Sequence, residues 1–218
     1  MNKISTISAR SREAILSKLE NAYENKDFVR SESIDPVGHI QTTNDPLSEM
    51  KQKMSDNKYI VEEATATTLE SKINEIAAIY GYKSLIYPAN LGLDLDKIEA
   101  TTKVCFDRPI EELRGEVFGS EFSIVHAKVG VSSHGVVLVP SSKDQPRMLS
   151  LAPKLCIMLL KKENIVPSLT HGLNLIKSEG ETLPTNILFI AGPSRTADIE
   201  LITVFGVHGP QKVHIIIY

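Results

Sequence analysis

The residues best suited to bind an anion follow the apolar run at 187–190, where the chain reads Gly-Pro-Ser-Arg-Thr-Ala-Asp-Ile-Glu. A strand that ends in such a segment presents backbone amides, hydroxyls and a guanidinium, which can receive a carboxylate or a phosphate. The alternative is structural, with the two acids paired to the arginine and the hydroxyls capping a turn. The ligand-binding residues expected in this segment are Ser194, Arg195, Thr196, Asp198 and Glu200, with Arg195 as the main anion-binding group.

A second unusual segment, Gly206-Val207-His208-Gly209-Pro210, precedes the last apolar run. Glycines let the backbone approach a neighbour closely, and a histidine between them can act as acid, base or hydrogen-bond donor near neutral pH. The alternative is a loop histidine that bonds a backbone carbonyl. We therefore add Gly206, His208 and Gly209 to the candidate ligand site. The candidate catalytic residues are His208 and Asp198.

Metal or redox chemistry is not expected in this chain. Cys105 and Cys156 are far apart, belong to no Cys-x-x-Cys pair and have apolar neighbours. These features indicate reduced core thiols rather than a zinc or iron–sulfur site. His208 and His214 lack further ligands at metal-site spacing, and a lone histidine in an apolar strand, such as His214, is more often structural. We expect no metal and no cofactor in the chain itself.

Composition excludes several classes of protein. The 218 residues are 42% hydrophobic and 23% charged, which is typical of a globular chain. A net charge of -3 argues against a nucleic-acid partner, which requires a basic face. No apolar run approaches the ~18 residues of a membrane span, and residues 1–30 are polar where a signal peptide would be apolar. We expect a cytoplasmic protein that binds neither nucleic acid nor membrane.

The elements that must position these residues divide the chain into two parts. Residues 1–44 predict an amphipathic helix over 5–24 and an extended linker over 26–46, whereas residues 45–218 predict an α/β domain. The helix could exchange between identical chains and make a homodimer. The strands expected in the domain are 59–61, 84–87, 104–106, 122–128, 135–140, 155–160, 186–191 and 212–218, and the helices are 45–54, 67–80, a short one after Pro109, and 164–178.

Alternation of strands and helices predicts a mostly parallel sheet covered on both faces, with ligands bound beyond the carboxyl ends of the strands. The short joint between the strands at 122–128 and 135–140 predicts an antiparallel hairpin. Pro167 is expected in the first turn of the helix at 164–178. In the turn at 130–135, Ser133 and His134 are not expected to form a catalytic pair, because adjacent side chains point apart in extended structure.

The order of these motifs resembles the LUD domain of lactate-utilisation protein C, most strongly from about residue 122 to the C-terminus. The segments that carry the resemblance are Arg147, Ala152-Pro153-Lys154, Ile165-Val166-Pro167, Gly192 to Glu200, Gly206 to Pro210, and His214. The resemblance implies a three-layer α/β sandwich similar to the NagB, ribose-5-phosphate isomerase and CoA-transferase folds. The chain departs from the family at Ser133, where many members have a glutamate. This change argues against covalent CoA-transferase chemistry.

The resemblance also implies work beside iron–sulfur subunits that oxidise lactate, with this chain as the component without clusters. Our interpretation of the sequence is therefore an accessory component of lactate or 2-hydroxy acid oxidation that binds a small anion or partner subunits. The alternative is a stand-alone binder or enzyme acting on a sugar phosphate, a CoA ester or a 2-hydroxy acid. Whether the chain is itself an enzyme stays open at this point.

Overall fold

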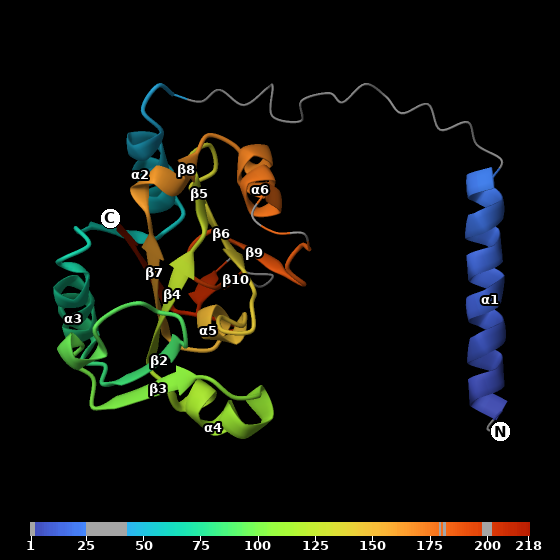
Figure 1. Cartoon of the computed structure of the whole chain (residues 1–218), viewed down its shortest axis with the longest axis horizontal. Coiled ribbons are helices and arrows are strands. Elements are labelled where there is room, and N and C mark those ends of the chain that lie inside the picture. Colours follow the sequence, from blue (N-terminus) through green and yellow to red (C-terminus); the bar gives the residue numbers. More distant parts are fainter. Residues whose placement is uncertain (1–2, 25–42, 179, 181, 198–201) are drawn as a thin grey trace. The chain divides into compact units, whose positions relative to one another are not determined.

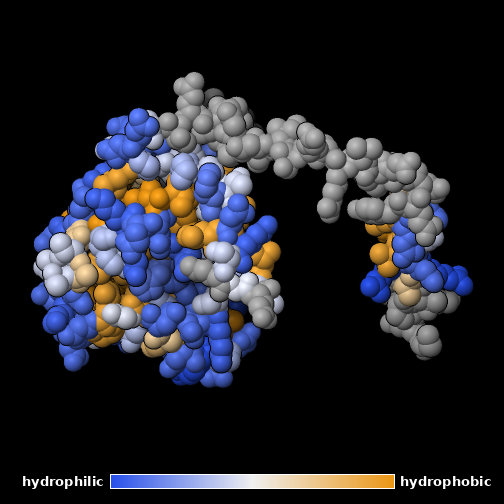
Figure 2. Space-filling model, turned by 45° about the horizontal axis from the view of Figure 1, so that its top comes forward, coloured by the Kyte–Doolittle hydropathy of each residue, from blue (hydrophilic) through white to orange (hydrophobic). Residues whose placement is uncertain are grey.

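The structure, a computed structural model, describes residues 3–24, 43–178, 180, 182–197 and 202–218 (Figure 1). It divides into two compact units, Met1–Gly38 and His39–Tyr218. In the first unit, helix α1 spans Lys3–Glu24 and exposes Ile15, Leu16 and Leu19. Figure 2 shows hydrophobic side chains gathered on one side of this helix. The helix predicted over 5–24 is present, whereas most of the linker predicted over 26–46 lies outside the described residues.

The second unit is built on a six-stranded sheet in which every adjacent pair of strands is parallel. All six residues of the run Leu155–Leu160 are buried, as expected for a strand covered on both faces. The strands lie in the order β1 (Ile60–Glu63), β12 (Lys212–Ile217), β7 (Leu155–Leu160), β4 (Phe122–Ala127), β2 (Ser84–Pro88) and β3 (Thr102–Phe106).

Helices and a second sheet cover this parallel sheet (Figure 1). On one face, α3 (Leu69–Tyr80) packs Ile73 and Ile76 against the strands, and Gly81 ends the helix in the left-handed conformation, with φ of 68°. On the other face lie α2 (Pro46–Asp56), α4 (Ile110–Gly119), the short α5 (Met148–Leu151) and part of the second sheet. The result is the predicted three-layer α/β architecture with a mostly parallel sheet.

The second sheet has four strands, and α6 (Leu169–Ser178) packs against it through Ile176. Its order is β8 (Ile165–Val166), β5 (Val129–Val131), β6 (Val136–Pro140) and β9 (Ile187–Ile190). A separate two-stranded ribbon joins β10 (Arg195–Ala197) to β11 (Thr203–Phe205), and two short 3₁₀ helices, Leu95–Lys97 and Lys162–Asn164, complete the elements. No pattern in the sequence indicated the β10–β11 ribbon.

Two predictions of local structure are wrong. An antiparallel hairpin forms here, but its first strand is β5 rather than the strand at 122–128. β4 stays in the parallel sheet, and of the predicted strand only Lys128 bonds to β6, through its backbone amide to the Leu138 carbonyl at 2.9 Å. The helix predicted from residue 164 begins only at Leu169. Ile165 and Val166 are instead β8, since a residue before proline favours extended backbone. The helix begins after Ser168, whose Oγ accepts a hydrogen bond from the His171 backbone amide at 3.4 Å.

Candidate functional site

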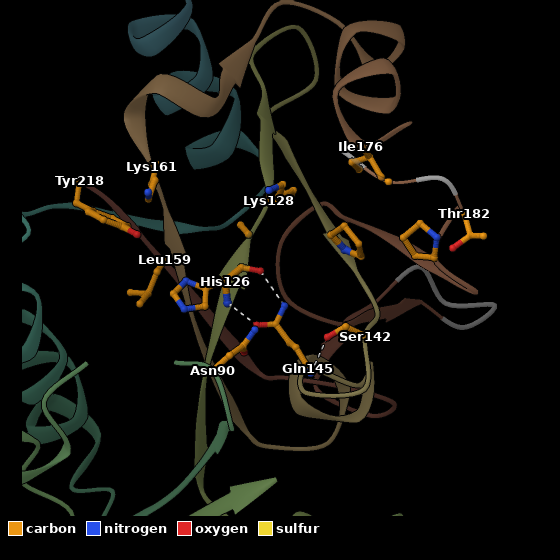
Figure 3. A pocket seen from close by; sticks show the side chains of 14 residues that line it. Asn90, His126, Lys128, Ser142, Gln145, Leu159, Lys161, Ile176, Thr182 and Tyr218 are labelled. Carbon is orange, nitrogen blue, oxygen red and sulfur yellow. Dashed lines mark hydrogen bonds between the residues drawn. The ribbon is translucent and has the colours of Figure 1, made fainter. Parts of the chain in front are cut away.

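The carboxyl ends of β4, β7 and β12 meet at one edge of the parallel sheet, and a cavity of about 480 Å³ opens there (Figure 3). This is the edge at which open α/β sheets generally bind their ligands. β4 contributes His126 at its end, Lys161 directly follows β7, and Tyr218 directly follows β12. The other lining residues are Asn90, Ala127, Lys128, Pro140, Ser142, Gln145, Leu159, Ile176, Gly180, Thr182 and Pro184.

The described lining of this cavity carries cations and no aspartate or glutamate. Lys128 and Lys161 supply the positive charge, and Lys161 is exposed and forms no ion pair within the described residues. Burial raises the pKa of the Tyr218 hydroxyl, with a further contribution from the negative charge of Glu163. The hydroxyl therefore remains a hydrogen-bond donor at neutral pH. The charge pattern favours an anionic ligand.

The backbone of His126 is held by the side chain of Gln145, which is only 8% exposed. The Gln145 Oε1 accepts from the His126 amide at 2.8 Å, and its Nε2 donates to the His126 carbonyl at 2.9 Å. The backbone amide of Gln145 in turn donates to Ser142 Oγ at 2.9 Å, and dashed lines in Figure 3 mark these three bonds. β7 pairs with β4 as far as Ala127, whereas β2 pairs only with Phe122 and Ser123, so on the side away from β7 the carboxyl end of β4 is held by a side chain rather than by a strand.

The hydrogen bond of the His126 ring shows which ring nitrogen carries a hydrogen. Its Nε2 lies 2.8 Å from the Leu91 carbonyl oxygen, which can only accept, so Nε2 carries a hydrogen. In the neutral ring Nδ1 is then an acceptor. Because His126 lines the cavity, this nitrogen could accept a hydrogen bond from a ligand hydroxyl.

The residues predicted as the ligand site lie mainly at the opposite edge, where β12 begins. Ser194, Gly206 and Gly209 form the base of the β10–β11 ribbon. The Ser194 amide donates to the Pro210 carbonyl at 2.9 Å, and the Gly206 amide donates to the Ser194 carbonyl at 2.9 Å. A Cβ on Gly206, whose φ is +81°, would lie 2.0 Å from Gln211 Cγ. The glycines do allow a close approach of the backbone, and that approach anchors the ribbon.

The other members of the predicted site are exposed or undescribed. Arg195 and Thr196 lie on β10, and Arg195 Nη2 donates to the Ala191 carbonyl at 3.1 Å. His208 is exposed, and its ring makes no hydrogen bond with the part of the chain that the structure describes. Asp198 and Glu200 lie outside the described residues. The structure therefore brings Ser194 together with the two glycines, and it does not gather Arg195 and His208 into the cavity at the carboxyl edge.

Sequence reasoning missed His126, Lys128, Gln145 and Lys161. A signal for some of them existed, because a parallel sheet places the residue after each strand at the ligand-binding edge. Lys161 follows the apolar run at 155–160 directly, so the same rule that predicted the edge could have named it. Gln145 gave no such signal, since it follows no strand and reaches β4 through a loop.

Two other polar pairs have structural roles. The prediction that Ser133 and His134 point apart is wrong, because the tight turn brings Ser133 Oγ within 2.8 Å of His134 Nδ1. Ser133 is nevertheless buried, and its carbonyl accepts from Lys53 Nζ at 2.8 Å. His214 is 1% exposed and its Nε2 lies 2.8 Å from the Tyr80 hydroxyl. Burial and the charge of Lys212 lower the pKa of His214 to about 4, so this histidine is a neutral core residue.

Within the described residues, no helix is long and apolar enough to cross a membrane. The same residues contain no group of three or more histidine, cysteine or acidic side chains arranged to hold a metal ion. The lining of the cavity offers ammonium, hydroxyl and imidazole groups, which can bind an anion.

Comparison with known proteins assigns the family. Residues 47–218 match the LUD domain. The chain belongs to the LUD domain family. Its fold is shared by a crystal structure of a DUF162 family protein from Deinococcus radiodurans, with a TM-score of 0.57 and 19% identity over 79% of this chain and 95% of that one.

Curated relatives of this LUD domain protein include an uncharacterized protein, YkgG, of Escherichia coli, which is 41% identical over 102 residues, 45% of this chain and 44% of the relative. Lactate utilization protein C of Bacillus subtilis is 40% identical over 92 residues, 41% of this chain and 38% of the relative. These two alignments span less than half of each relative. Lactate utilization protein C of Geobacillus thermodenitrificans aligns over 79% of this chain and 78% of its own length, at 28% identity.

Proposed function

We propose that this LUD domain protein is an accessory, cluster-free component of a lactate or 2-hydroxy acid oxidation system. In this proposal it binds a small anion in the cavity at the carboxyl edge of the sheet and works beside iron–sulfur subunits in the cytoplasm. The lactate utilization names of several relatives support the pathway. The observation that carries the binding role is the cavity itself, whose described lining has lysines and no carboxylate.

The chemistry of the lining fits a carboxylate that bears a neighbouring hydroxyl or carbonyl group. Lys161 can face the carboxylate, and a hydrogen bond to a charged group is worth ~1.5–3 kcal/mol. The Tyr218 hydroxyl can donate to a second oxygen, and His126 Nδ1 can accept from a ligand hydroxyl. These assignments need no residue of the β10–β11 ribbon.

A second candidate function follows from the size of the cavity. Its volume of about 480 Å³ lies within the ~300–1,000 Å³ range of pockets for ligands of drug size, and a three-carbon acid would occupy only a small part of it. The spare room favours a larger anion, such as a sugar phosphate or a CoA ester. In that case the chain is a binder or enzyme in its own right.

The test of binding uses two adjacent lysines. Lys161 lines the cavity and Lys162 does not, although both are exposed. Calorimetric titration of the full chain and of Lys161→Glu and Lys162→Glu is made with L-lactate, pyruvate, ribose 5-phosphate and CoA. We expect at least one of these anions to bind, with about tenfold or greater weakening in Lys161→Glu, since loss of one charged hydrogen bond costs over ~1.4 kcal/mol.

The matched Lys162→Glu variant should retain binding to within about threefold. Equal weakening in both variants would show only a general effect of charge, and absence of binding by all four anions would contradict the proposal. If the chain alone converts the bound anion to product, the second candidate replaces the accessory role. If dye reduction by lactate requires purified iron–sulfur subunits together with this chain, the accessory role stands.

A further inference from the structure

The β10–β11 ribbon presents apolar side chains that the rest of the described chain does not cover. Every residue of both strands is exposed, and the ribbon pairs with no other strand. Phe205 is 42% exposed, Val204 is 50% exposed and Val207 is 51% exposed. An isolated two-stranded ribbon is only marginally stable in water, and clustered exposed apolar residues usually mark an interaction surface.

A groove lies at the foot of this ribbon, on the amino edge of the parallel sheet. It has a volume of about 590 Å³, and its walls include the buried Tyr59, Phe205 and the starts of β1 and β12 at Ile60 and Lys212. Tyr59 is immobilised there by the bond from its hydroxyl to the Ile190 carbonyl at 2.6 Å. The lining of the groove therefore contains one fixed aromatic residue, Tyr59, and one exposed aromatic ring, that of Phe205.

Cations surround the groove. Lys58 and Lys212 belong to its lining, and both are exposed. Burial raises the pKa of Tyr59, and a hydrogen bond from the Gly192 backbone and the positive charge of Arg195 oppose this rise. The Arg195 guanidinium is therefore close to Tyr59. Within the described residues, none of the three cations forms an ion pair. The groove thus joins apolar walls to a basic rim, in a chain whose net charge is -3.

The sign of this charge decides between two kinds of occupant. In a symmetric dimer the same surface meets itself, so the basic rim with Lys58 and Lys212 would be placed against the same basic rim of the second copy. Like charges placed together at an interface are strongly unfavourable. An acidic partner relieves this repulsion and covers the apolar ribbon as well, so charge complementarity favours a different protein over a second copy.

We propose that this groove, bounded by the β10–β11 ribbon and the starts of β1 and β12, docks an acidic segment of a partner protein through an apolar anchor side chain. The anchor lies between Tyr59 and Phe205, and carboxylates flanking it pair with Lys58 and Lys212. The docking groove is separate from the anion cavity, because the two lie at opposite edges of the same parallel sheet. Either can exist without the other.

The test uses a fluorescein-labelled peptide with the pattern Glu-Asp-Leu-Phe-Glu-Leu-Asp-Glu, and fluorescence anisotropy with the full chain. Two comparison peptides replace the acids by lysine or the three apolar residues by alanine. Variants of the groove are the double change Lys58→Glu with Lys212→Glu, and Phe205→Ser. Their matched controls are the double change Lys143→Glu with Lys177→Glu, at exposed positions outside the groove, and Phe118→Ser, which removes an exposed phenylalanine from α4. Thermal unfolding verifies that each variant is folded.

Of the three peptides, we expect only the acidic one to bind saturably. The double lysine change should weaken its binding at least about tenfold and Phe205→Ser about fivefold, whereas both control variants should keep nearly the original affinity. No binding of the acidic peptide below about 1 mM would overturn the proposal, as would equal binding of the lysine peptide. So would an unchanged affinity in the groove variants. A dimer in sedimentation that Phe205→Ser dissociates would assign the surface to a second copy instead.

Discussion

The buried histidine of the parallel sheet predicts a specific loss of stability in acid. His214 is 1% exposed, and its pKa is lowered from 6.5 to about 4 by burial and by the charge of Lys212. Nε2 is bonded to Tyr80, Nδ1 has no hydrogen-bond partner within the described residues, and its nearest carboxylate oxygen, on Glu62, lies 3.9 Å away. A proton added at Nδ1 would therefore be buried without a good acceptor.

The direction and the size of this loss of stability follow from the difference in the His214 pKa between the folded and the unfolded chain. Below about pH 6.5 the unfolded chain binds a proton at this histidine, whereas the folded chain does not until about pH 4. The stability that depends on the neutral ring is thus fully present above this window and is lost as the pH falls through it. With ~1.4 kcal/mol for each pKa unit, the loss between about pH 7 and about pH 5 is about 2 kcal/mol.

The assay is urea unfolding at these two pH values for the original chain and for His214→Gln, which cannot titrate but can still bond Tyr80. The lowered pKa values of Asp45 and Asp94 affect both proteins alike and cancel in the comparison. We expect the free energy of unfolding to fall by about 2 kcal/mol more in the original chain than in the variant. An equal fall in the two proteins would refute the reasoning, because His214 would then not be the group that takes up the proton.

Three further predictions concern other positions. Gly192→Ala should lower the free energy of unfolding by more than ~2 kcal/mol, since φ there is +99° and the new Cβ would lie 2.1 Å from the Asn57 carbonyl oxygen. Urea unfolding measures this loss of stability. A loss below ~0.5 kcal/mol would show that the backbone at this contact is not rigid. Lys58 has a φ of 70° at the end of α2, so Lys58→Gly should raise the free energy of unfolding by up to ~1 kcal/mol in the same assay, and a decrease would contradict this. Burial raises the pKa of the Cys156 thiol to about 12, so in a thiol titration only Cys105 should react in the folded chain, with the second thiol appearing in denaturant; two fast thiols would disprove the burial.

The parallel sheet was predictable because its central strands are nearly continuous apolar runs. Runs such as 155–160 and 213–217 are buried on both faces, so burial selects apolar residues at nearly every position and the pattern is unambiguous. The path between strands was harder to predict. The bend at Lys128, where the chain leaves the parallel sheet for the second sheet, depends on pairing with β6, and nothing local in the sequence marks it.

The candidate site was predicted less well than the fold for a related reason. Glycine, serine and proline at 192–194 and 206–210 are unusual residues, and sequence reasoning interpreted them as a ligand site, but they also suit the base of a ribbon in which backbones touch. The cavity, by contrast, is lined by ordinary lysine, glutamine and tyrosine residues that acquire meaning only from their common position at the ends of strands. The predicted site at Arg195 and His208 stays a prediction.

The most direct test of the central claim is a crystal structure of the full chain with a bound anion, either pyruvate or ribose 5-phosphate. We expect the anion beside Lys161 and Tyr218, with His126 within hydrogen-bond distance, in the cavity at the carboxyl edge of the sheet. An anion bound instead by Arg195 and His208 at the opposite edge would contradict the claim and would restore the site that the sequence first suggested.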